Sequence, residues 1–518
     1  MTMNNLTNNN GIGVDKNYDS DFCGSIPLHL INLTQPHGML LVLDSELRIR
    51  QISENAADHL GIPAEEFLEK PLAEYVNEAQ YEELLAKLEL RNQGEKIPFT
   101  LSFHTSGEEK QFTALIHTEP AYLLIELEEG ANYQSHTITE FFQQIKYATS
   151  RLKQTESVES IARVAAEEIK RFTDFDKVLI YQFDKQWNGT VIGQAKEDDM
   201  SDFMGLRFPA SDIPKQAREL YFKSPYRLIP TRDYTPVRLL PVINPLTQRF
   251  TDLSDCNLRS VAGVHLEYMA NMGIMASMSL PIIIENKLWG IISCHHKTAK
   301  NPDFEERNAM ELLSSIISSQ LAAKERENVI SLQLTLRSKH ATLLEQLYNS
   351  NSFVDGLFHG ETNLQELLSL TGAAVSYDGE IKTMGNTPPI QKVKELVSWL
   401  RRNSTEQIFY THHLPHLYPN SKDYKNEASG LIAIPLNTEQ GEFILGFREE
   451  TLQTVNWGGN PDQAIQLEPD GKKYHPRNSF ALYQETVKFT SIPWLEEEVA
   501  AAETLQNAVM GKIIREKF

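Results

Sequence analysis

The sequence predicts an α+β protein of three consecutive domains, each an antiparallel sheet flanked by helices, joined by a long helical spine. Three observations predict this fold. The chain has 518 residues, and a domain takes roughly 150 residues, so about three domains are expected. Short apolar runs with strand periodicity recur between helical stretches rich in Glu, Leu and Ala. The stretch between Pro302 and Gly356 contains neither proline nor glycine and keeps apolar residues at helical spacing, as a helix that spans two domains would.

The N-terminal part predicts a flexible segment over residues 1–24 and a small domain over 25–132. The first residues, MTMNNLTNNNGIGVDKNYDS, are rich in Asn and poor in apolar side chains, which is typical of a flexible tail. After Cys23-Gly24, the apolar runs MLLVLD and AYLLIELE flank helical stretches. This order indicates an antiparallel sheet with helices packed against it.

The second domain is expected over residues 138–325. Residues 138–172 predict one helix, with Phe141, Ile145, Ala148 and Leu152 at intervals of three to four. The strands VLIYQFD and GTVIGQA follow, then a proline-rich polar region and a helix around 264–272. The strands SMSLPIII and LWGIISCHH complete the sheet.

The third domain is expected over residues 326–514, with a body of mixed strands and helices and a closing helix from Trp494 to Phe518. Glu468-Pro469-Asp470-Gly471 is a strong turn signal, which predicts a hairpin at about 449–490. The spine and the closing helix carry apolar stripes, at Met310, Leu313, Ile317, Leu321, Leu332, Leu336, Leu343 and Leu347, and at Val499, Leu505, Val509 and Ile513. Helices of this length commonly pack against a partner, so we expect a homodimer.

Composition argues against nucleic acid and membrane as partners. The formal net charge is -21, and the sequence has no basic stripe, no run of about 18 apolar residues and no secretory signal. The three cysteines are odd in number and widely spaced, which suits a reducing compartment. We therefore expect a cytoplasmic protein.

Motifs of enzyme chemistry are absent from the sequence. It contains no glycine-rich phosphate loop, no GxSxG nucleophile turn and no HExxH zinc pair. Cys294-His295-His296 has no fourth metal ligand nearby in sequence, so we expect no metal site. The residues alone indicate no catalytic site.

The segment FPASDIP, residues 208–214, is the most constrained part of the second domain. Two prolines restrict the backbone around Asp212, and the helical run KQARELY follows directly. A carboxylate ahead of a helix N-terminus is ordinarily a helix cap. Read in isolation, Asp212 is therefore best interpreted as a cap.

Four blocks of sequence, in the expected order, give the chain a resemblance to the photosensory module of bacterial phytochromes. They are Cys23 ahead of the first domain, FPASDIPKQARELY, LRSVAGVHLEYMANMGIMASMSL with the later LWGIISCHH, and WGGNP with PRNSF. The resemblance implies PAS, GAF and PHY domains, with the N-terminal segment threaded through a GAF loop in a knot. It implies a red/far-red light photoreceptor whose linear tetrapyrrole (bilin) isomerises at its C15=C16 bond, and an output domain absent from this chain.

The resemblance also implies a set of bilin-binding residues whose chemistry suits that ligand. Arg227 and Arg259 would face the two propionates, because planar guanidinium groups pair with carboxylates at two points. His295 would hydrogen-bond the terminal lactam carbonyl, and His265 would lie near the pyrrole nitrogens. The remaining expected pocket residues are Tyr181, Phe208, Asp212, Ile213, Tyr221, Tyr268, Ser277 and Ser279.

Asp212 gains a second role from the resemblance. Its backbone carbonyl would accept from the pyrrole N–H groups, and its carboxylate would meet a hairpin of the PHY domain, the tongue, which carries Trp457. The resemblance implies an Asp212–Arg477 ion pair in one state and an Asp212–Ser479 hydrogen bond in the other. Residues 479–488 also fit an amphipathic helix, so the tongue sequence suits an element with two states.

The cysteines indicate which bilin is bound. Plant and many cyanobacterial relatives attach the bilin through a cysteine just before the GAF histidine, and here that position is Val264. Cys23 stands where biliverdin-binding bacterial members have their attachment site, so the resemblance implies biliverdin IXα in a thioether to Cys23. Ala262 departs from relatives that carry a serine near a propionate.

Two alternatives are a tetrapyrrole-processing enzyme and a light-independent PAS/GAF sensor of another small molecule. The absence of a redox-cofactor motif argues against the enzyme, and the light-independent sensor leaves Cys23 and the two arginines unexplained. The expected effector is a histidine kinase or a diguanylate cyclase, which acts through a response regulator or a nucleotide signal.

Overall fold

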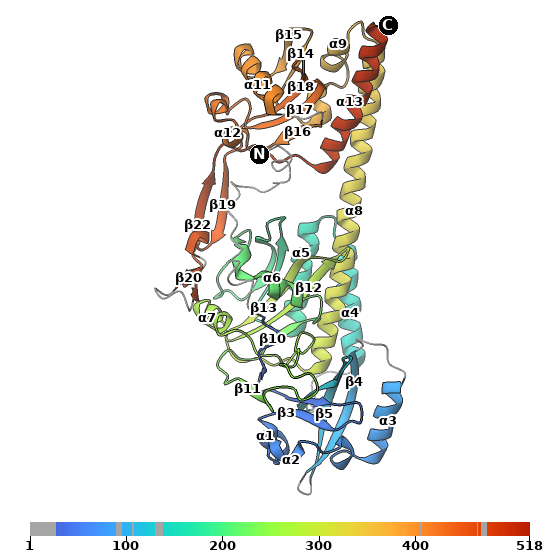
Figure 1. Cartoon of the computed structure of the whole chain (residues 1–518), viewed down its shortest axis with the longest axis vertical. Coiled ribbons are helices and arrows are strands. Elements are labelled where there is room, and N and C mark those ends of the chain that lie inside the picture. The colour runs from blue at the N-terminus through green and yellow to red at the C-terminus, as the bar shows by residue number, and fades with distance from the viewer. Residues whose placement is uncertain are drawn as a thin grey trace.

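The computed structural model shows three sheets arranged one after another along a single long helix, α8 (Phe304–Asn349) (Figure 1). It describes residues 27–89, 96–105, 108–129, 138–403, 407–463, 465–467 and 474–517. The predicted knot and the attachment residue Cys23 depend on an N-terminal segment that lies outside these residues. The predicted α+β fold with three consecutive domains is confirmed.

The first domain is built on a seven-stranded sheet of order β1-β11-β3-β2-β6-β5-β4. Its own strands and helices are β1 (Leu33–Thr34), β2 (Met39–Leu43), β3 (Ile49–Ser53), β4 (Lys96–Thr105), β5 (Glu108–Thr118), β6 (Leu123–Glu129), α1 (Ala56–Leu60), α2 (Ala64–Phe67), the 3-10 turn Leu72–Glu74 and α3 (Glu78–Glu89). β11 (Val237–Leu240) comes from the second domain and pairs with both β1 and β3. The first two domains therefore share a sheet, which local sequence patterns did not predict.

The second domain contains an eight-stranded sheet of order β10-β12-β13-β7-β8-β9-β19-β22. Its own elements are β7 (Lys177–Phe183), β8 (Gly189–Lys196), β9 (Arg207–Phe208), β10 (Arg227–Ile229), β12 (Ala276–Ile284), β13 (Lys287–His296), α6 (Lys215–Leu220) and α7 (Gly263–Asn271). The last two strands, β19 (Gln453–Gly458) and β22 (Leu482–Val487), belong to the third domain. The predicted strands and the two short helices of this domain are confirmed.

The single helix predicted over 138–172 is wrong, because two helices occupy this stretch. They are α4 (Ile138–Lys153) and α5 (Val158–Thr173). Ser157 caps α5 by accepting from the Ser160 backbone N–H, while the Ser160 hydroxyl accepts from the Ser157 N–H. This capping box starts a new helix at a point where apolar spacing alone showed continuity.

The third domain has a five-stranded antiparallel sheet of order β15-β14-β18-β17-β16. Its elements are α9 (Phe353–Phe358), α10 (Leu364–Leu368), β14 (Gly372–Tyr377), β15 (Glu380–Gly385), α11 (Ile390–Asn403), β16 (Phe409–Thr411), α12 (Leu414–Leu417), β17 (Gly430–Asn437), β18 (Glu442–Arg448) and α13 (Glu496–Lys517). α13 lies along the end of α8 (Figure 1), and Leu505, Val509 and Ile513 pack with Leu343 and Leu347 in one core. The predicted apolar stripes of the two helices are thereby confirmed.

The long helix α8 belongs to two cores in turn. Met310, Ile317 and Leu321 pack in the core of the second domain, and Leu336, Leu343 and Leu347 pack in that of the third.

Among the described residues, no helix is both long enough and apolar enough to cross a lipid bilayer.

A hairpin formed by β19 and β22 extends from the third domain to the second (Figure 1). Its strands pair antiparallel, and Trp457 of β19 pairs with Arg207 of β9, so the hairpin continues the second sheet. Beyond it, β20 (Ile465–Leu467) and β21 (Tyr474–Pro476) form a short ladder. Leu482–Val487 is a strand here, so the structure contains the hairpin form rather than the helical one. The turn predicted at 468–471 lies outside the described residues.

Candidate functional site

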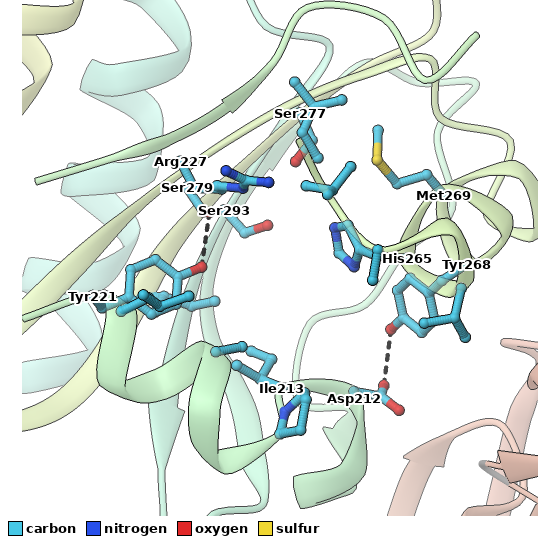
Figure 2. Close-up of a pocket in the computed structure, with 18 of the residues that line it drawn as sticks. Asp212, Ile213, Tyr221, Arg227, His265, Tyr268, Met269, Ser277, Ser279 and Ser293 are labelled. Carbon is cyan, nitrogen blue, oxygen red and sulfur yellow. Dashed lines mark hydrogen bonds between the residues drawn. The ribbon is translucent and has the colours of Figure 1, made fainter. Parts of the chain in front are cut away.

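The second domain contains a pocket lined by all the predicted bilin-binding residues that the structure describes, and Figure 2 shows part of its lining. These residues come from the sheet, from α6 and α7, and from the loops that join them, namely Tyr181, Phe208, Asp212, Ile213, Tyr221, Arg227, Arg259, His265, Tyr268, Ser277, Ser279 and His295. Apolar side chains, among them Met269 and Ile291, make up much of the remaining wall. An apolar pocket with a few convergent polar groups is typical of a small-molecule site.

The sheet wall of the pocket carries a polar patch that crosses three strands. Side chains two apart on a strand share a face, so Ser277 and Ser279 point the same way on β12. Ser279 lies opposite Arg227 on β10 and opposite Ser293 on β13, while Ser277 lies opposite His295. The Tyr221 and Ser279 hydroxyls are hydrogen-bonded at 2.8 Å. Polar groups from four elements thus converge on one side of the pocket (Figure 2).

Two arginines on this side, Arg227, which is partly buried, and Arg259, which is buried, have no carboxylate partner among the described residues. Arg227 donates through Nη1 to the Arg259 carbonyl at 2.8 Å, and Arg259 is only 4% exposed. Burial first, and then the charge of Arg259, lower the pKa of Arg227 to about 9. Burial also lowers the pKa of Arg259. Two adjacent cations, one buried and one partly buried, are costly unless an anion neutralises them, so this end of the pocket is suited to a ligand with acidic groups.

Two neutral histidines line the rest of the pocket. Burial, reinforced by Arg227, lowers the pKa of His265 to about 4. Burial, with smaller effects of Lys177 and His265, lowers the pKa of His295 to about 3. His295 Nε2 lies 2.9 Å from the Ser293 hydroxyl, while its Nδ1 is buried with no partner in the described part of the chain. A buried nitrogen in this state is available to a polar group of a ligand.

Ser293 also lines the pocket and was not predicted from the sequence, although the alternation of the strand could have indicated it. Ser293 stands two residues before His295 on β13, so the two side chains share a face. A hydroxyl at this position can fix the orientation of the His295 ring, and the alternation of the strand was enough to suggest it.

Asp212 is not a helix cap, so that interpretation is wrong. It ends a 3-10 turn (Ala210–Asp212), and α6 begins after Pro214 with no side-chain cap. The carboxylate instead points away from α6 and accepts from the Tyr268 hydroxyl at 2.8 Å (Figure 2). It also forms an ion pair with Arg477. Burial raises the pKa of Asp212 against the effects of Arg477 and Tyr268, so its charge depends on these partners.

Pro476 of the third domain lines the pocket, and the next residue, Arg477, contacts the pocket residues Asp212 and Phe208. Arg477 follows β21, is 2% exposed, and lies near the rings of Phe208 and Phe480, at 5.3 Å and 4.9 Å from their centroids. Burial lowers its pKa, but Asp212, Tyr268 and Tyr181 together outweigh this and leave the pKa raised. The Asn271 amide donates to the Arg477 carbonyl at 3.1 Å, which fixes the backbone to α7. The Asp212–Arg477 ion pair is therefore a buried contact that joins the second and third domains.

Trp457 and Ser479 occupy different environments. Trp457 is buried and donates to Glu485 across the hairpin at 3.0 Å, while the Arg207 guanidinium lies 5.3 Å from its ring centroid. Gly458 passes so close to Phe208 that an added Cβ would lie 2.6 Å from the ring. Ser479 is exposed, and its hydroxyl accepts from the Ala481 N–H at 3.4 Å rather than donating to Asp212.

The described cysteines lie away from the ligand side of the pocket. Cys294 is buried in the core of the domain, and burial raises its pKa. Cys256 is buried at the contact with the first domain. Val264 lines the pocket next to His265, where it offers no nucleophile. The described residues contain no group of His, Cys, Asp or Glu side chains that could hold a metal ion.

Lys177 is a buried amine close to His295, and no local sequence pattern singled it out. It lies opposite His295 in the sheet, is 2% exposed, and donates to the Ser201 carbonyl at 3.3 Å. Its Nζ is 3.8 Å from the centroid of Phe203, which lines the pocket. Burial, with a contribution from Lys196, lowers the pKa of Lys177 to about 8.

Lys177→Met is expected to remove a pH dependence of stability between about pH 8 and 10.5. In this window the folded chain has lost the amine proton and the unfolded chain still binds it, so the wild-type free energy of unfolding rises with pH. A shift of this size corresponds to a rise of up to about 3 kcal/mol. Urea unfolding of both proteins at pH 7, 8, 9 and 10 measures it, and identical pH profiles would contradict the assignment.

Comparisons with known proteins agree with this architecture. Family descriptions match in order along the chain, as a PAS fold over residues 23–130, a GAF domain over 157–324 and a phytochrome region over 336–517. Cyanobacterial phytochrome B from Nostoc sp. is 37% identical over 98% of this chain and 68% of its own length. The Bacteriophytochrome of Pseudomonas aeruginosa is 30% identical over 94% of this chain and 66% of its own. The chain thus spans about two thirds of the length of these relatives.

Solved structures give the same result. A bacteriophytochrome from R. palustris superposes with a TM-score of 0.85 at 34% identity, over 96% of this chain and 99% of that one. The photosensory core module of the Stigmatella aurantiaca phytochrome superposes with a TM-score of 0.83 at 36% identity, with the same coverage.

Proposed function

The chain belongs to the phytochrome family as a photosensory module, and from this premise we propose that it is a red/far-red light photoreceptor that binds biliverdin IXα covalently through Cys23. The observation that carries the proposal is the pair of adjacent arginines, Arg227 and Arg259, which line one end of a largely apolar pocket without a carboxylate partner among the described residues. A bilin has two propionates and a large apolar surface, so the residues present fit it. In this proposal the domain boundaries are those predicted from the sequence, at 25–132, 138–325 and 326–514.

When bound, the bilin supplies the light reaction, isomerisation at C15=C16. Arg227 and Arg259 bind the propionates, and Ser277 and Ser279 add hydroxyl donors on the same wall. Because its pKa is lowered, His295 stays neutral and offers Nδ1 to the terminal lactam. Tyr181 and Phe208 are packed against each other and shape the apolar part of the pocket.

Asp212 relays the change in the pocket to the third domain. Its carboxylate binds Tyr268 on the pocket side and Arg477 on the hairpin side, so a displaced Tyr268 changes the partners of the Asp212–Arg477 pair. We assign the β19–β22 hairpin as the tongue, whose second state is helical at 479–488 with Ser479 bonded to Asp212. α8 and α13 then carry the change toward an output domain.

The proposed partners follow from the same premise. The protein is a cytoplasmic homodimer through its long helices, and its output domain is a histidine kinase or a diguanylate cyclase. The photosensory module itself is not an enzyme in this proposal. The long helix α8 exposes Leu312, Ile330 and Leu334, which supports a helical dimer contact.

Mixing the purified protein with biliverdin tests the proposed function. We expect a covalent adduct, retained on denaturing gels, whose red band shifts reversibly under red and far-red light. Binding without photoconversion would favour a tetrapyrrole-processing enzyme. Absence of binding would leave a light-independent sensor of another small molecule.

A further inference from the structure

A buried carboxylate, Glu126, lies between the first domain and the loop that carries Arg259. On β6, Ile125 and Leu127 point into the core of the first domain, so Glu126 faces the opposite side of the sheet. That side is an apolar contact between the domains, made of Leu40, Val42, Tyr122, Leu124, Leu239, Leu253, Cys256 and Leu258. Glu126 is 3% exposed within it. An acid in such a place requires strong partners.

The partners of Glu126 are three consecutive residues of the second domain and one histidine. The carboxylate accepts from the backbone N–H groups of Asn257 at 3.0 Å and Leu258 at 2.6 Å, and from the Cys256 thiol at 3.1 Å. His117 Nε2 lies 2.6 Å away. Burial works to raise the pKa of Glu126, but these hydrogen bonds outweigh it and hold the pKa at about 2. Glu126 is therefore charged, and both of its carboxylate oxygens have hydrogen-bond partners.

The next residue along this loop is Arg259, whose position depends on the loop in two ways. Its guanidinium donates to the carbonyls of Leu253 and Ser254 at 3.2 and 3.3 Å. Its own carbonyl accepts from Arg227 Nη1 at 2.8 Å. Both pocket arginines are thus placed by the loop that Glu126 holds.

The charges around the two arginines also connect Glu126 to the pocket. Arg227 lies beside the buried Arg259, and the two cations repel one another. Burial lowers the pKa of Arg259, and Glu126 is among the groups that raise it. The neighbouring Cys256 thiol is neutral, because burial and Glu126 raise its pKa well above the ordinary value. Three carboxylates, Glu126, Asp252 and Asp255, raise the pKa of Arg259, and Glu126 is the buried one among them.

We infer that Glu126 is a positioning residue of the first domain, which fixes Arg259, and through it Arg227, for binding the acidic groups of the pocket ligand. This inference rests on the proposed function, because the acidic groups are the propionates of a bilin. It gives the first domain a defined part in ligand affinity, through one side chain that never enters the pocket.

The test measures the preference for free propionates in Glu126→Gln. The whole chain carries Cys23→Ala so that binding stays reversible, and affinities for biliverdin and for its dimethyl ester are measured by absorbance titration. The parent protein is expected to prefer the free acid by at least about tenfold, since charge-assisted pairs are strong. In Glu126→Gln, whose amide cannot accept from both N–H groups, that preference is expected to fall by about tenfold.

Glu128→Gln is the matched control, because Glu128 lies two residues along the same strand and pairs with Arg307 of α8 at 2.8 Å. It disturbs the same domain contact without touching the loop, so the preference should persist. A wild-type preference in Glu126→Gln would overturn the inference, as would an equal loss in both variants. If Glu126→Gln fails to fold, Glu126→Asp is measured, and an unchanged preference there has the same meaning. Failure of the proposed function is distinct, since the protein with Cys23 intact would then bind no biliverdin either.

Discussion

Asp212→Ala is expected to release the β19–β22 hairpin from the second domain. The variant leaves Arg477 as a cation at 2% exposure with no carboxylate, and leaving one partner of a buried ion pair unpaired costs about 3–5 kcal/mol. Of the other contacts of the hairpin tip, the ring of Phe480 is apolar and the His475–Glu267 pair is solvent-exposed, so neither replaces the carboxylate beside Arg477. Undocking, which returns Arg477 to water, is the less costly outcome.

Hydrogen exchange of residues 453–458 and 482–487 measures this release. In the wild type the β19–β22 ladder continues the second sheet and is expected to exchange slowly, while Asp212→Ala should exchange faster by at least about a hundredfold, as 3 kcal/mol implies. Protection equal to that of the wild type would show that the Asp212–Arg477 ion pair does not hold the hairpin on the second domain. The control is Asp212→Ala with Arg477→Met, which removes both charges and should recover part of the protection.

The same variant bears on signalling in the pigmented protein. If Asp212 links the pocket to the tongue, Asp212→Ala should impair photoconversion, since neither Arg477 nor Ser479 retains its partner. A normal photocycle in this variant would contradict the role given to Asp212, even if the hairpin were released.

The sequence predicted those parts of the fold that depend on local patterns. The stripe on α8 could be read because its residues recur at helical spacing, and one helix then serves two cores. The pocket residues could be predicted because they lie in the sequence blocks that resemble those of bacterial phytochromes. The sheet then brings Ser277, Ser279 and His295 to one wall of the pocket. Periodicity and motif spacing sufficed in these cases.

Long-range contacts account for what the sequence did not show. Asp212 has the local pattern of a helix cap, but its partner Arg477 lies 265 residues away. Strand β11 joins the sheet of another domain, and no property of its four residues indicates which sheet it completes. Glu126 is a further example, because a single acid in an apolar strand shows neither its burial nor its bond to Leu258. Such partners are chosen by tertiary packing.

Cys23→Ala is expected to abolish covalent attachment of biliverdin while leaving reversible binding. The chain has three cysteines, and the other two cannot replace Cys23. Cys294 is fully buried, and burial raises its pKa, so its reactive thiolate is not formed. Cys256 is 1% exposed, and its neutral thiol donates a hydrogen bond to Glu126. Val264, at the other attachment position known in the family, has no thiol.

Attachment needs only a thiolate and an alkene, so its loss can be attributed to one residue. The sulfur adds to one vinyl carbon of ring A, the π bond breaks, and the other carbon takes up a proton, with no oxidant involved. Zinc-induced fluorescence of the pigment on denaturing gels reports the covalent bond, and absorbance of the native protein reports binding. Cys256→Ala is the matched control and should keep the covalent pigment. Covalent pigment on Cys23→Ala would refute the assignment, whereas loss of all binding would mean that Arg227, Arg259 and the pocket contribute less affinity than their burial implies.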